Sequence, residues 1–325
     1  MNKPAGDWPR PLQPVTGPFR ADKIDGALLG MGDYGDATRA LGATGVVQPD
    51  MITGMTLYLI ANQPRPKPTS ATDGDAAKGS DRSKGNGVSG GVWVRERFTI
   101  HAPVRRDDAF TVTGAATGTY VRKGRRYSTT ASESLDAAGN RMATNLTTGL
   151  LTYRADPDLP DSEDGLALED TPEPQPDWSA AAKNPHLDAL RAATVGESYG
   201  TEPVHLSLAM MVARDTANPD NPIHSDPEAA KETGLRRPIA GGSHVLAMPL
   251  EAIMGAWGPE ALLHGSCLDV RWKAPAEDGI DLVPTVTVVA NGSDDQGRER
   301  LLLDLNVSIV DGPVAMVGTV VVPTT

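Results

Sequence analysis

The sequence predicts an α+β protein in which one structural plan occurs twice, an apolar helix followed by a run of antiparallel strands. Three observations predict this class. Two apolar segments have helical spacing and length, each is followed by four segments of alternating polar and apolar residues, and an acidic, proline-rich stretch separates the two sets. We expect each sheet to wrap around its own helix.

The first copy of the plan lies within residues 1–154. Its apolar segment, MITGMTLYLIAN at 51–62, is expected to form the buried helix, with Asp50 as the N-cap. Residues 62–91 contain almost no large apolar side chain, so burial cannot offset the entropy of ordering them, and we interpret them as a mobile insertion. The expected strands share period-two patterning and are separated by turn residues such as Gly, Asn and Asp. They cover 92–104, 108–124, 125–139 and 140–154.

The second copy, residues 186–325, repeats this order of elements. The segment GGSHVLAMPLEAIMGAWG at 241–258 is expected to form the second apolar helix, broken late by Pro249 and Gly255. Residues 155–185 are acidic and proline-rich, which is typical of an extended linker between two halves. The strands expected in this half lie at 265–276, 281–292, 298–312 and 313–323.

The composition excludes several classes of partner. The 325 residues are 39% hydrophobic and 22% charged, as in soluble globular proteins. The formal net charge of −12 disfavours nucleic acid and membrane surfaces. The N-terminus has no apolar signal segment, and no apolar run approaches the roughly 18 residues of a membrane span. The single cysteine, Cys267, fits a reducing compartment and is expected to be a packed thiol at the start of a strand. We therefore expect a cytoplasmic protein that binds neither nucleic acid nor membrane.

The candidate chemistry lies in ANPDNPIHSDPEAAKETGLRRPIAGG, residues 217–242. Ser225 and the following Asp-Pro-Glu predict a capping box and the start of a helix, which places His224 just before a helix N-terminus. One interpretation is that Asp220, Asn221 and His224 only hydrogen-bond this turn and cap the helix. The other is that they form one side of an active site.

The glycine pair that ends this stretch favours the second interpretation. Gly241 and Gly242 begin the apolar helix, where they allow a ligand to approach bare backbone N–H groups at the positive end of the helix dipole. Such donors suit a thioester oxygen on which negative charge develops. The combination predicts an acid/base site facing an activated carbonyl.

At this point the sequence resembles the hydratase motif of the MaoC-like family, which comprises (R)-specific 2-enoyl-CoA hydratases and 3-hydroxyacyl thioester dehydratases with the hot-dog fold. The duplicated plan resembles the single-chain double hot-dog members, in which the N-terminal half has lost the catalytic motif and shapes the acyl pocket. The resemblance therefore implies two antiparallel sheets, each wrapped around a central helix, either separate or merged into one continuous sheet. The residues that match the motif are Asn221, Pro222, Ile223, His224, Asp226, Ala229, Ala230, Gly234, Pro238, Ile239 and Gly242.

The resemblance also implies roles for individual residues. His224 matches the catalytic histidine, and Gly242 matches the glycine whose N–H binds the thioester oxygen. Pro219 stands where the family keeps its catalytic aspartate, so Asp220 is expected to take that role and to hold a water molecule together with His224. Gly241 replaces a histidine that is common in the family. The neighbours expected to contact the substrate are Asn221, Gly241 and Ser243.

The implied activity is reversible hydration of a 2-enoyl-CoA, or of another enoyl thioester such as one on an acyl carrier. Coenzyme A is then part of the substrate, and no metal or separate cofactor is expected; a homodimer is left open. The basic cluster in YVRKGRRYS has two interpretations, a charged hairpin turn or a site for the phosphates of coenzyme A. Its residues include Arg122, Lys123 and Arg125.

Two other functions remain open at the level of sequence. A hot-dog thioesterase would direct water to the thioester carbonyl, but the Asn-Pro-Ile-His set argues against it. A catalytically inactive subunit that binds acyl thioesters is favoured by the displaced aspartate at Pro219.

Overall fold

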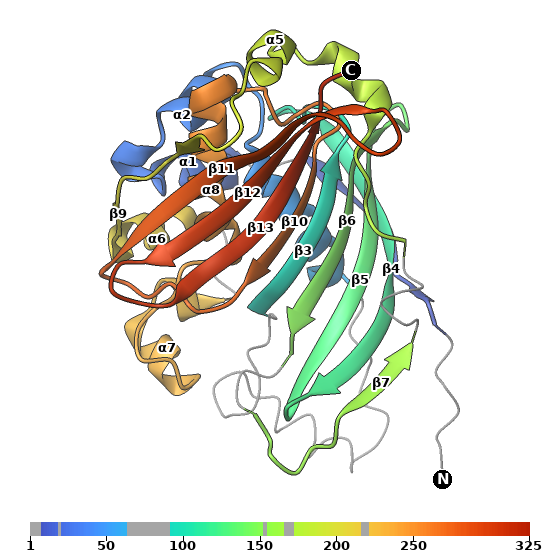
Figure 1. Ribbon diagram of the computed structural model, residues 1–325. Helices are drawn as coiled ribbons and strands as arrows, with labels where there is room; N and C mark the ends of the chain where they lie inside the picture. Colours follow the sequence, from blue (N-terminus) through green and yellow to red (C-terminus); the bar gives the residue numbers. More distant parts are fainter. Residues whose placement is uncertain (1–7, 19–20, 64–91, 152–154, 166–171, 216–220) are drawn as a thin grey trace.

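One antiparallel sheet runs through the whole molecule. The computed structural model describes residues 8–18, 21–63, 92–151, 155–165, 172–215 and 221–325. Within them the sheet has 13 strands, and its main path is β1-β4-β5-β6-β3-β10-β13-β12-β11-β8. The strands fan across the front of the molecule, and the long helix α8 lies behind them (Figure 1). The fold is therefore α+β as predicted, with the two expected sheets merged into one.

The N-terminal half contributes helices first and long strands afterwards. Its helices are α1 (Ala21–Leu29), η1 (Gly32–Tyr34), α2 (Asp36–Ala43), η2 (Pro49–Ile52) and α3 (Thr53–Ala61). Its strands are β1 (Arg10–Pro11), β2 (Val15–Pro18), β3 (Val92–Ile100), β4 (Ala109–Arg122), β5 (Arg125–Asp136) and β6 (Arg141–Leu150). The strand β7 (Ser162–Gly165) follows within the predicted linker and pairs with β4. The predicted insertion lies outside the described residues from residue 64 to residue 91.

The C-terminal half repeats the order with a longer central helix. Its helices are η4 (Trp178–Lys183), α5 (Leu187–Arg191), α6 (Leu208–Asp215), η5 (Pro222–His224), α7 (Pro227–Glu232) and α8 (Gly242–Trp257). Its strands are β8 (Ser198–Tyr199), β9 (Val204–Leu206), β10 (Cys267–Trp272), β11 (Ile280–Ser293), β12 (Glu299–Ile309) and β13 (Val314–Pro323). All eight strands predicted from alternation are present, four in each half.

The two halves join where β3 pairs with β10. The pairing is antiparallel and runs from Cys267 opposite Thr99 to Arg271 opposite Arg95. A bidentate ion pair between Arg95 and Asp269 crosses the same junction, with Nε–Oδ1 at 2.8 Å and Nη2–Oδ2 at 2.5 Å. Because the ladder is continuous, the helices of both halves pack under one sheet.

The central helices differ in length. Helix α8 has 16 residues and α3 has 9. The predicted break near the end of α8 is wrong: the helix continues through Pro249 and Gly255 to Trp257. It ends at Gly258, where φ is +112° and a Cβ atom would lie 2.3 Å from the ring of His186. The burial of α8 among the strands outweighs the local helix-breaking tendencies.

Glu251 of α8 ties the helices of the two halves together. Its carboxylate accepts hydrogen bonds from the backbone N–H groups of Ala37 and Thr38, at 2.6 and 2.8 Å, and from the Thr38 hydroxyl at 2.5 Å. These N–H groups belong to the first turn of α2, which would otherwise lack acceptors for them. A carboxylate at this position is also favoured by the dipole of α2.

Part of the predicted linker packs on the sheet. The Thr99 hydroxyl donates to the Gln175 carbonyl at 2.7 Å, and the Cys267 thiol donates to the Pro174 carbonyl at 3.3 Å. Burial raises the pKa of Cys267 to about 11, so this residue is a packed thiol as predicted.

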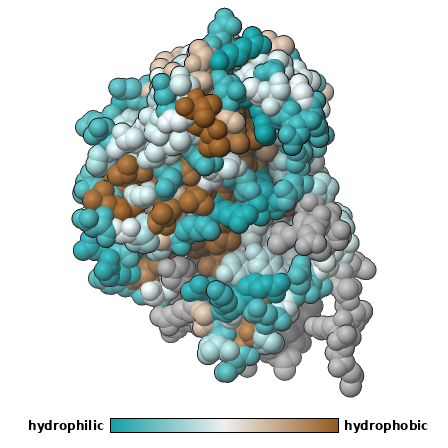
Figure 2. Space-filling view, viewed as in Figure 1, coloured by the Kyte–Doolittle hydropathy of each residue, from teal (hydrophilic) through white to brown (hydrophobic). Residues whose placement is uncertain are grey.

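The face of the molecule shown in Figure 2 carries both hydrophilic and hydrophobic patches.

The interior of the N-terminal half contains a cluster of buried polar groups. The Glu96 side chain is fully buried, and its Oε1 accepts hydrogen bonds from Asn145 Nδ2 at 3.0 Å and Thr147 Oγ1 at 2.9 Å. Nearby on the same face, the hydroxyls of Thr56 on α3 and Ser132 on β5 lie 2.7 Å apart. Burial raises the pKa of Glu96 to about 8, partly opposed by its two hydrogen bonds.

This shift predicts a pH dependence of folding stability. Between the ordinary glutamate pKa of 4.5 and the pKa of about 8 in the folded protein, the folded state holds a proton that the unfolded state has released. The free energy of unfolding therefore falls as pH rises through this window. Urea titrations at pH 5, 6, 7 and 8 should show a shallower fall for Glu96→Gln than for the wild type. The exposed variant Glu202→Gln serves as the control, and equal slopes in all three proteins would contradict the assignment.

Candidate functional site

A small pocket of about 120 Å³ lies where elements of the two halves meet. The N-terminal half contributes residues of α1, η2, α3 and β3, and the C-terminal half contributes residues of α6, η5 and the first turn of α8. The lining residues are Lys23, Asp50, Met51, Gly54, Leu57, Trp93, Met211, Arg214, His224, Gly241, Ser243 and His244. Three residues predicted from the motif, His224, Gly241 and Ser243, are among them.

Local capping fixes the turn that carries His224. Asp226, rather than Ser225 as predicted, is the N-cap of α7: its carboxylate accepts from the N–H groups of Glu228 at 2.8 Å and Ala229 at 3.3 Å. Pro227 occupies the first helical position, as predicted, where its missing N–H has no cost. The turn preceding it is the 3-10 helix η5, which ends at His224.

The hydrogen bonds of His224 define its tautomer. Nδ1 lies 2.7 Å from the carbonyl oxygen of Ile239, which can only accept, so Nδ1 carries the proton. Nε2 therefore has a free lone pair, and it accepts from Asn221 Nδ2 at 3.0 Å. Burial lowers the pKa of His224, partly opposed by the bond to Ile239. The ring is thus a neutral base whose orientation is set by two contacts.

The start of α8 supplies donors on the other side. Among the described residues, the N–H groups of Gly242 and Ser243 have no hydrogen-bond acceptor, as is usual for the first turn of a helix. Gly242 lies between the lining residues Gly241 and Ser243. It packs against Trp272, whose Nε1 donates to the Gly242 carbonyl at 3.1 Å. The free N–H groups carry the positive end of the dipole of a 16-residue helix.

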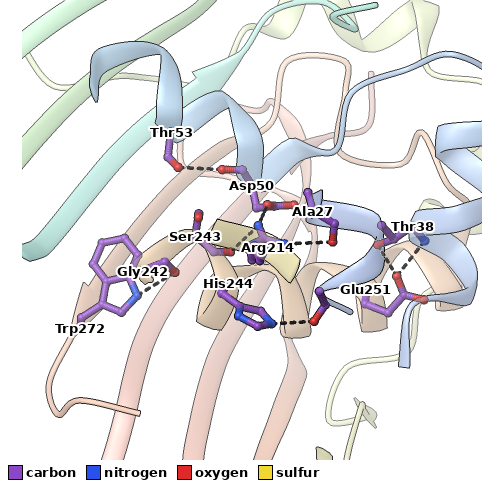
Figure 3. A network of polar contacts seen from close by, with 11 residues as sticks. Ala27, Thr38, Asp50, Thr53, Arg214, Gly242, Ser243, His244, Glu251 and Trp272 are labelled. Atoms are coloured by element: carbon purple, nitrogen blue, oxygen red, sulfur yellow. Dashed lines mark hydrogen bonds and ion pairs between the residues drawn. The ribbon is translucent and has the colours of Figure 1, made fainter. Parts of the chain in front are cut away.

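A buried ion pair holds this helix start against the N-terminal half. Arg214 of α6 pairs with Asp50 of η2, and the same guanidinium donates to the carbonyls of Ala27 at 3.3 Å and Ser243 at 3.2 Å (Figure 3). The Asp50 carbonyl accepts from the Thr53 hydroxyl at 2.7 Å. Asp50 was predicted as the N-cap of the apolar helix, but Ile52 occupies the N-cap of α3. The Asp50 carboxylate instead forms the ion pair with Arg214.

The electrostatics of the pocket depend on the buried Asp50–Arg214 ion pair and on the dipole of α8. Burial raises the pKa of Asp50, while the adjacent Arg214 acts to lower it. Burial and Arg214 lower the pKa of His244 to about 3, so this ring is neutral and donates from Nε2 to the Gly30 carbonyl at 2.8 Å. His244 is a hydrogen-bonded core residue. The helix dipole favours an anionic oxygen at the start of α8.

The structure does not bring all the predicted site residues together. Arg122, Lys123 and Arg125 lie at the turn between β4 and β5, and none of them lines the pocket. Their hairpin is held by Arg122 Nη2, 3.3 Å from Glu163, and by the Lys123 N–H, 2.9 Å from Asp161. A charged hairpin turn is therefore the interpretation that the contacts favour. Asp220 lies outside the described residues, whereas Asn221 contacts His224 directly.

The pocket also includes residues that the motif analysis did not single out. Asp50, Arg214 and Trp93 come from segments without a recognisable motif. The only sequence signal for any of the three was the position of Asp50 just before an apolar helix. An acidic residue at such a position is equally typical of an ordinary N-cap, so it did not identify a site residue.

Two further properties concern ligands and membranes. The described part of the chain holds no group of three or more His, Cys, Asp or Glu side chains arranged to bind a metal ion. None of its helices combines the length and the apolar composition that a bilayer crossing requires.

The packing of Gly242 predicts a position-specific effect of a single methyl group. A Cβ atom on Gly242 would lie 3.0 Å from the Trp272 ring, whereas one on Gly241 would meet nothing within 4 Å. Gly242→Ala is expected to lower the free energy of unfolding by about 1–3 kcal/mol through overpacking. Gly241→Ala should cost about 1 kcal/mol or less, because its φ of −60° suits alanine and only a modest N-cap preference is lost. Equal losses in chemical denaturation would contradict this packing.

The ion pair predicts a coupling between the two halves. Arg214→Met leaves the Asp50 carboxylate buried without a partner, so it is expected to lower the free energy of unfolding by about 3–5 kcal/mol. The double variant Asp50→Asn/Arg214→Met removes both charges and should recover part of this loss. A double-mutant cycle by urea denaturation measures the coupling, and simple additivity of the two single variants would argue against it.

Comparisons with known proteins agree with this architecture. Residues 191–299 match the family model described as MaoC like domain. A sequence search found no match among curated proteins. Three solved structures with related folds illustrate the range of similarity, and all have sequence identities below 20%.

The first is a MaoC-like dehydratase, 19% identical, with a TM-score of 0.66 over 97% of this chain and 98% of that one. The second is peroxisomal multifunctional enzyme type 2 from Drosophila melanogaster, 15% identical, with a TM-score of 0.60. That match covers 96% of this chain but only 48% of the fly enzyme. The third, from Mycobacterium tuberculosis, is described as having a double hot-dog fold and is 14% identical, with a TM-score of 0.57 over 96% of each chain. The resemblance inferred from the motif is thus confirmed: the chain has the double hot-dog fold, and residues 191–299 match the MaoC-like domain model.

Proposed function

We propose that the protein is a hydro-lyase that catalyses the reversible hydration of a 2-enoyl thioester, such as a 2-enoyl-CoA, to the 3-hydroxyacyl thioester. The observation that carries the proposal is the pairing, around one pocket, of a histidine with a fixed basic Nε2 and a helix start whose N–H groups have no acceptor among the described residues. The MaoC-like domain supports a hydratase or dehydratase type of reaction.

The proposed chemistry assigns a role to each of these groups. The thioester oxygen accepts a hydrogen bond from the Gly242 N–H, where the helix dipole stabilises the negative charge of the enolate. A water molecule, held between His224 and Asp220, loses a proton to this pair as its oxygen bonds to C3. The pair then delivers a proton to C2, so the added groups enter from one face. A donor to the oxyanion typically contributes about 10²–10³-fold in rate, and a positioned acid/base group contributes about 10²–10⁴-fold.

Asn221 has a supporting role in this scheme. Its amide donates to the lone pair of His224 Nε2, which helps to orient the ring. A bound water can take that place when the substrate enters. The remaining contact, from Nδ1 to the Ile239 carbonyl, keeps the tautomer unchanged.

Hydration of crotonyl-CoA tests the proposal directly, because loss of the conjugated double bond lowers the ultraviolet absorbance. His224→Ala is expected to reduce kcat by about 10²–10⁴-fold. Asp220→Asn is expected to reduce kcat over the same range, about 10²–10⁴-fold. His205→Ala is the matched control, since this histidine is exposed and bonded to Asp281. Release of free thiol in place of hydration would instead identify a thioesterase. Binding of enoyl-CoA without turnover would identify an inactive acyl-thioester-binding subunit, the alternative that Pro219 favours.

The lowered pKa of His224 predicts the pH profile. Because the neutral ring is the active base and burial lowers its pKa, kcat/KM should hold on the acid side until pH falls well below the ordinary histidine value of 6.5. The measurement is kcat/KM for hydration from pH 5 to pH 8. An acidic limb centred at or above pH 6.5 would contradict a buried, neutral His224.

A further inference from the structure

Glu96 lies under the same sheet face as the proposed site, close to the start of α8. Its register partner on β10 is Val270, two residues before Trp272, whose ring packs on Gly242. Residues two apart on a strand share a face, so Glu96, Val270 and Trp272 all point toward the helices. With strands about 4.8 Å apart and a rise of about 3.3 Å per residue, the Cα atoms of Glu96 and Trp272 lie about 8 Å apart. Trp93, three residues before Glu96, lines the pocket itself.

The polar groups around Glu96 are incompletely satisfied. Among the described residues, Glu96 Oε2 and Asn145 Oδ1 are buried and have no hydrogen-bond partner. Both side chains are at most 2% exposed. They lie on the same face of the sheet, since Asn145 is opposite Phe98, two residues after Glu96 on β3. Buried polar atoms without partners are rare, because each one costs the free energy of its desolvation.

The corresponding region of the C-terminal half is apolar. In the middle of β10, β12 and β13 the inward-facing side chains are aliphatic and buried, whereas Trp272 lies at the end of β10; the central helix of this half, α8, has 16 residues. The buried aliphatic side chains include Leu301, Leu303, Val320, Leu268 and Val270. The corresponding interior of the N-terminal half, under a 9-residue helix, combines apolar side chains such as Phe98 and Ile100 with the polar cluster around Glu96. Fold stability alone does not require that polarity, because the second copy is built without it.

We propose that Glu96 and Asn145 are specificity-determining residues that bind a hydroxyl group on the acyl chain of the substrate. This inference rests on the proposed function, because it assigns the acyl chain of the thioester to the interior of the N-terminal half. Glu96 donates from the protonated Oε2 to the ligand oxygen, and Asn145 Oδ1 accepts the ligand's hydroxyl proton. A hydroxyl satisfies both orphan atoms at once, whereas a methylene chain satisfies neither. The substrate class is therefore a 2-enoyl thioester with an oxygenated acyl chain.

The protonation state of Glu96 agrees with a donor role. Burial raises its pKa to about 8, so the carboxyl group is neutral at pH 7. Asn145 Nδ2 and Thr147 Oγ1 both donate to Oε1, which leaves the proton on Oε2.

Binding of saturated acyl-CoAs tests this inference without requiring turnover. The probes are octanoyl-CoA and four octanoyl-CoAs that each carry one hydroxyl, at C5, C6, C7 or C8, with Kd measured by titration calorimetry. The wild type should bind one hydroxylated probe about tenfold more tightly than octanoyl-CoA. Glu96→Met should abolish that preference while leaving Kd for octanoyl-CoA within about threefold. Glu96→Gln, which keeps a donor and an acceptor, should retain most of the preference.

The outcomes separate this inference from the proposed function. Equal affinity of the wild type for all five probes, or equal weakening of all five in Glu96→Met, would overturn the role of Glu96. A lost preference in Glu96→Met that Glu96→Gln keeps would support it even if crotonyl-CoA is not hydrated, a result that would count against the proposed function alone. Glu133→Gln, on the opposite face of β5 from Ser132, is the matched control and should change no ratio.

Discussion

The antiparallel pairing of β3 with β10 is the constraint on which the rest of the structure depends. It converts two copies of a helix-and-sheet plan into one continuous sheet and so places the helices of both halves under a common face. Only in that arrangement can Asp50 of the first half reach Arg214 of the second. The ion pair in turn contacts the Ser243 carbonyl and holds the start of α8 beside the turn that carries His224. The candidate site is thus a product of the junction between the halves.

The two copies differ in the length of the central helix and in the polarity of the side chains packed around it. The C-terminal copy keeps a long, apolar central helix, whose first-turn N–H groups at Gly242 and Ser243 have no acceptor among the described residues. The N-terminal copy keeps a shorter helix over an interior that includes the polar cluster around Glu96. In the proposed function, one half carries the acid/base and oxyanion chemistry, and the other recognises the acyl chain. Burial is the common physical cause: it keeps His224 neutral and Glu96 protonated.

The sequence alone predicted most of the fold, because alternation and turn chemistry are local signals. All eight long strands were predicted, and the turn residues expected between them include Asp136, whose carboxylate accepts from the Asn140 N–H at 2.7 Å. The break predicted in α8 was wrong because tertiary packing outweighs the local effect of Pro249. In the site, His224 and the glycine pair were found from one continuous motif. Asp50 and Arg214 were not, since they lie 164 residues apart and only the fold brings them together.

The account's central claim is that the thioester sits between His224 and the start of α8. A crystal structure with bound octanoyl-CoA, which has no double bond to hydrate, tests it most directly. The account predicts the thioester oxygen within about 3 Å of the Gly242 N–H, C3 of the acyl chain facing Nε2 of His224, and the chain directed toward Glu96. A thioester bound away from the first turn of α8, with His224 Nε2 still bonded only to Asn221, would contradict it.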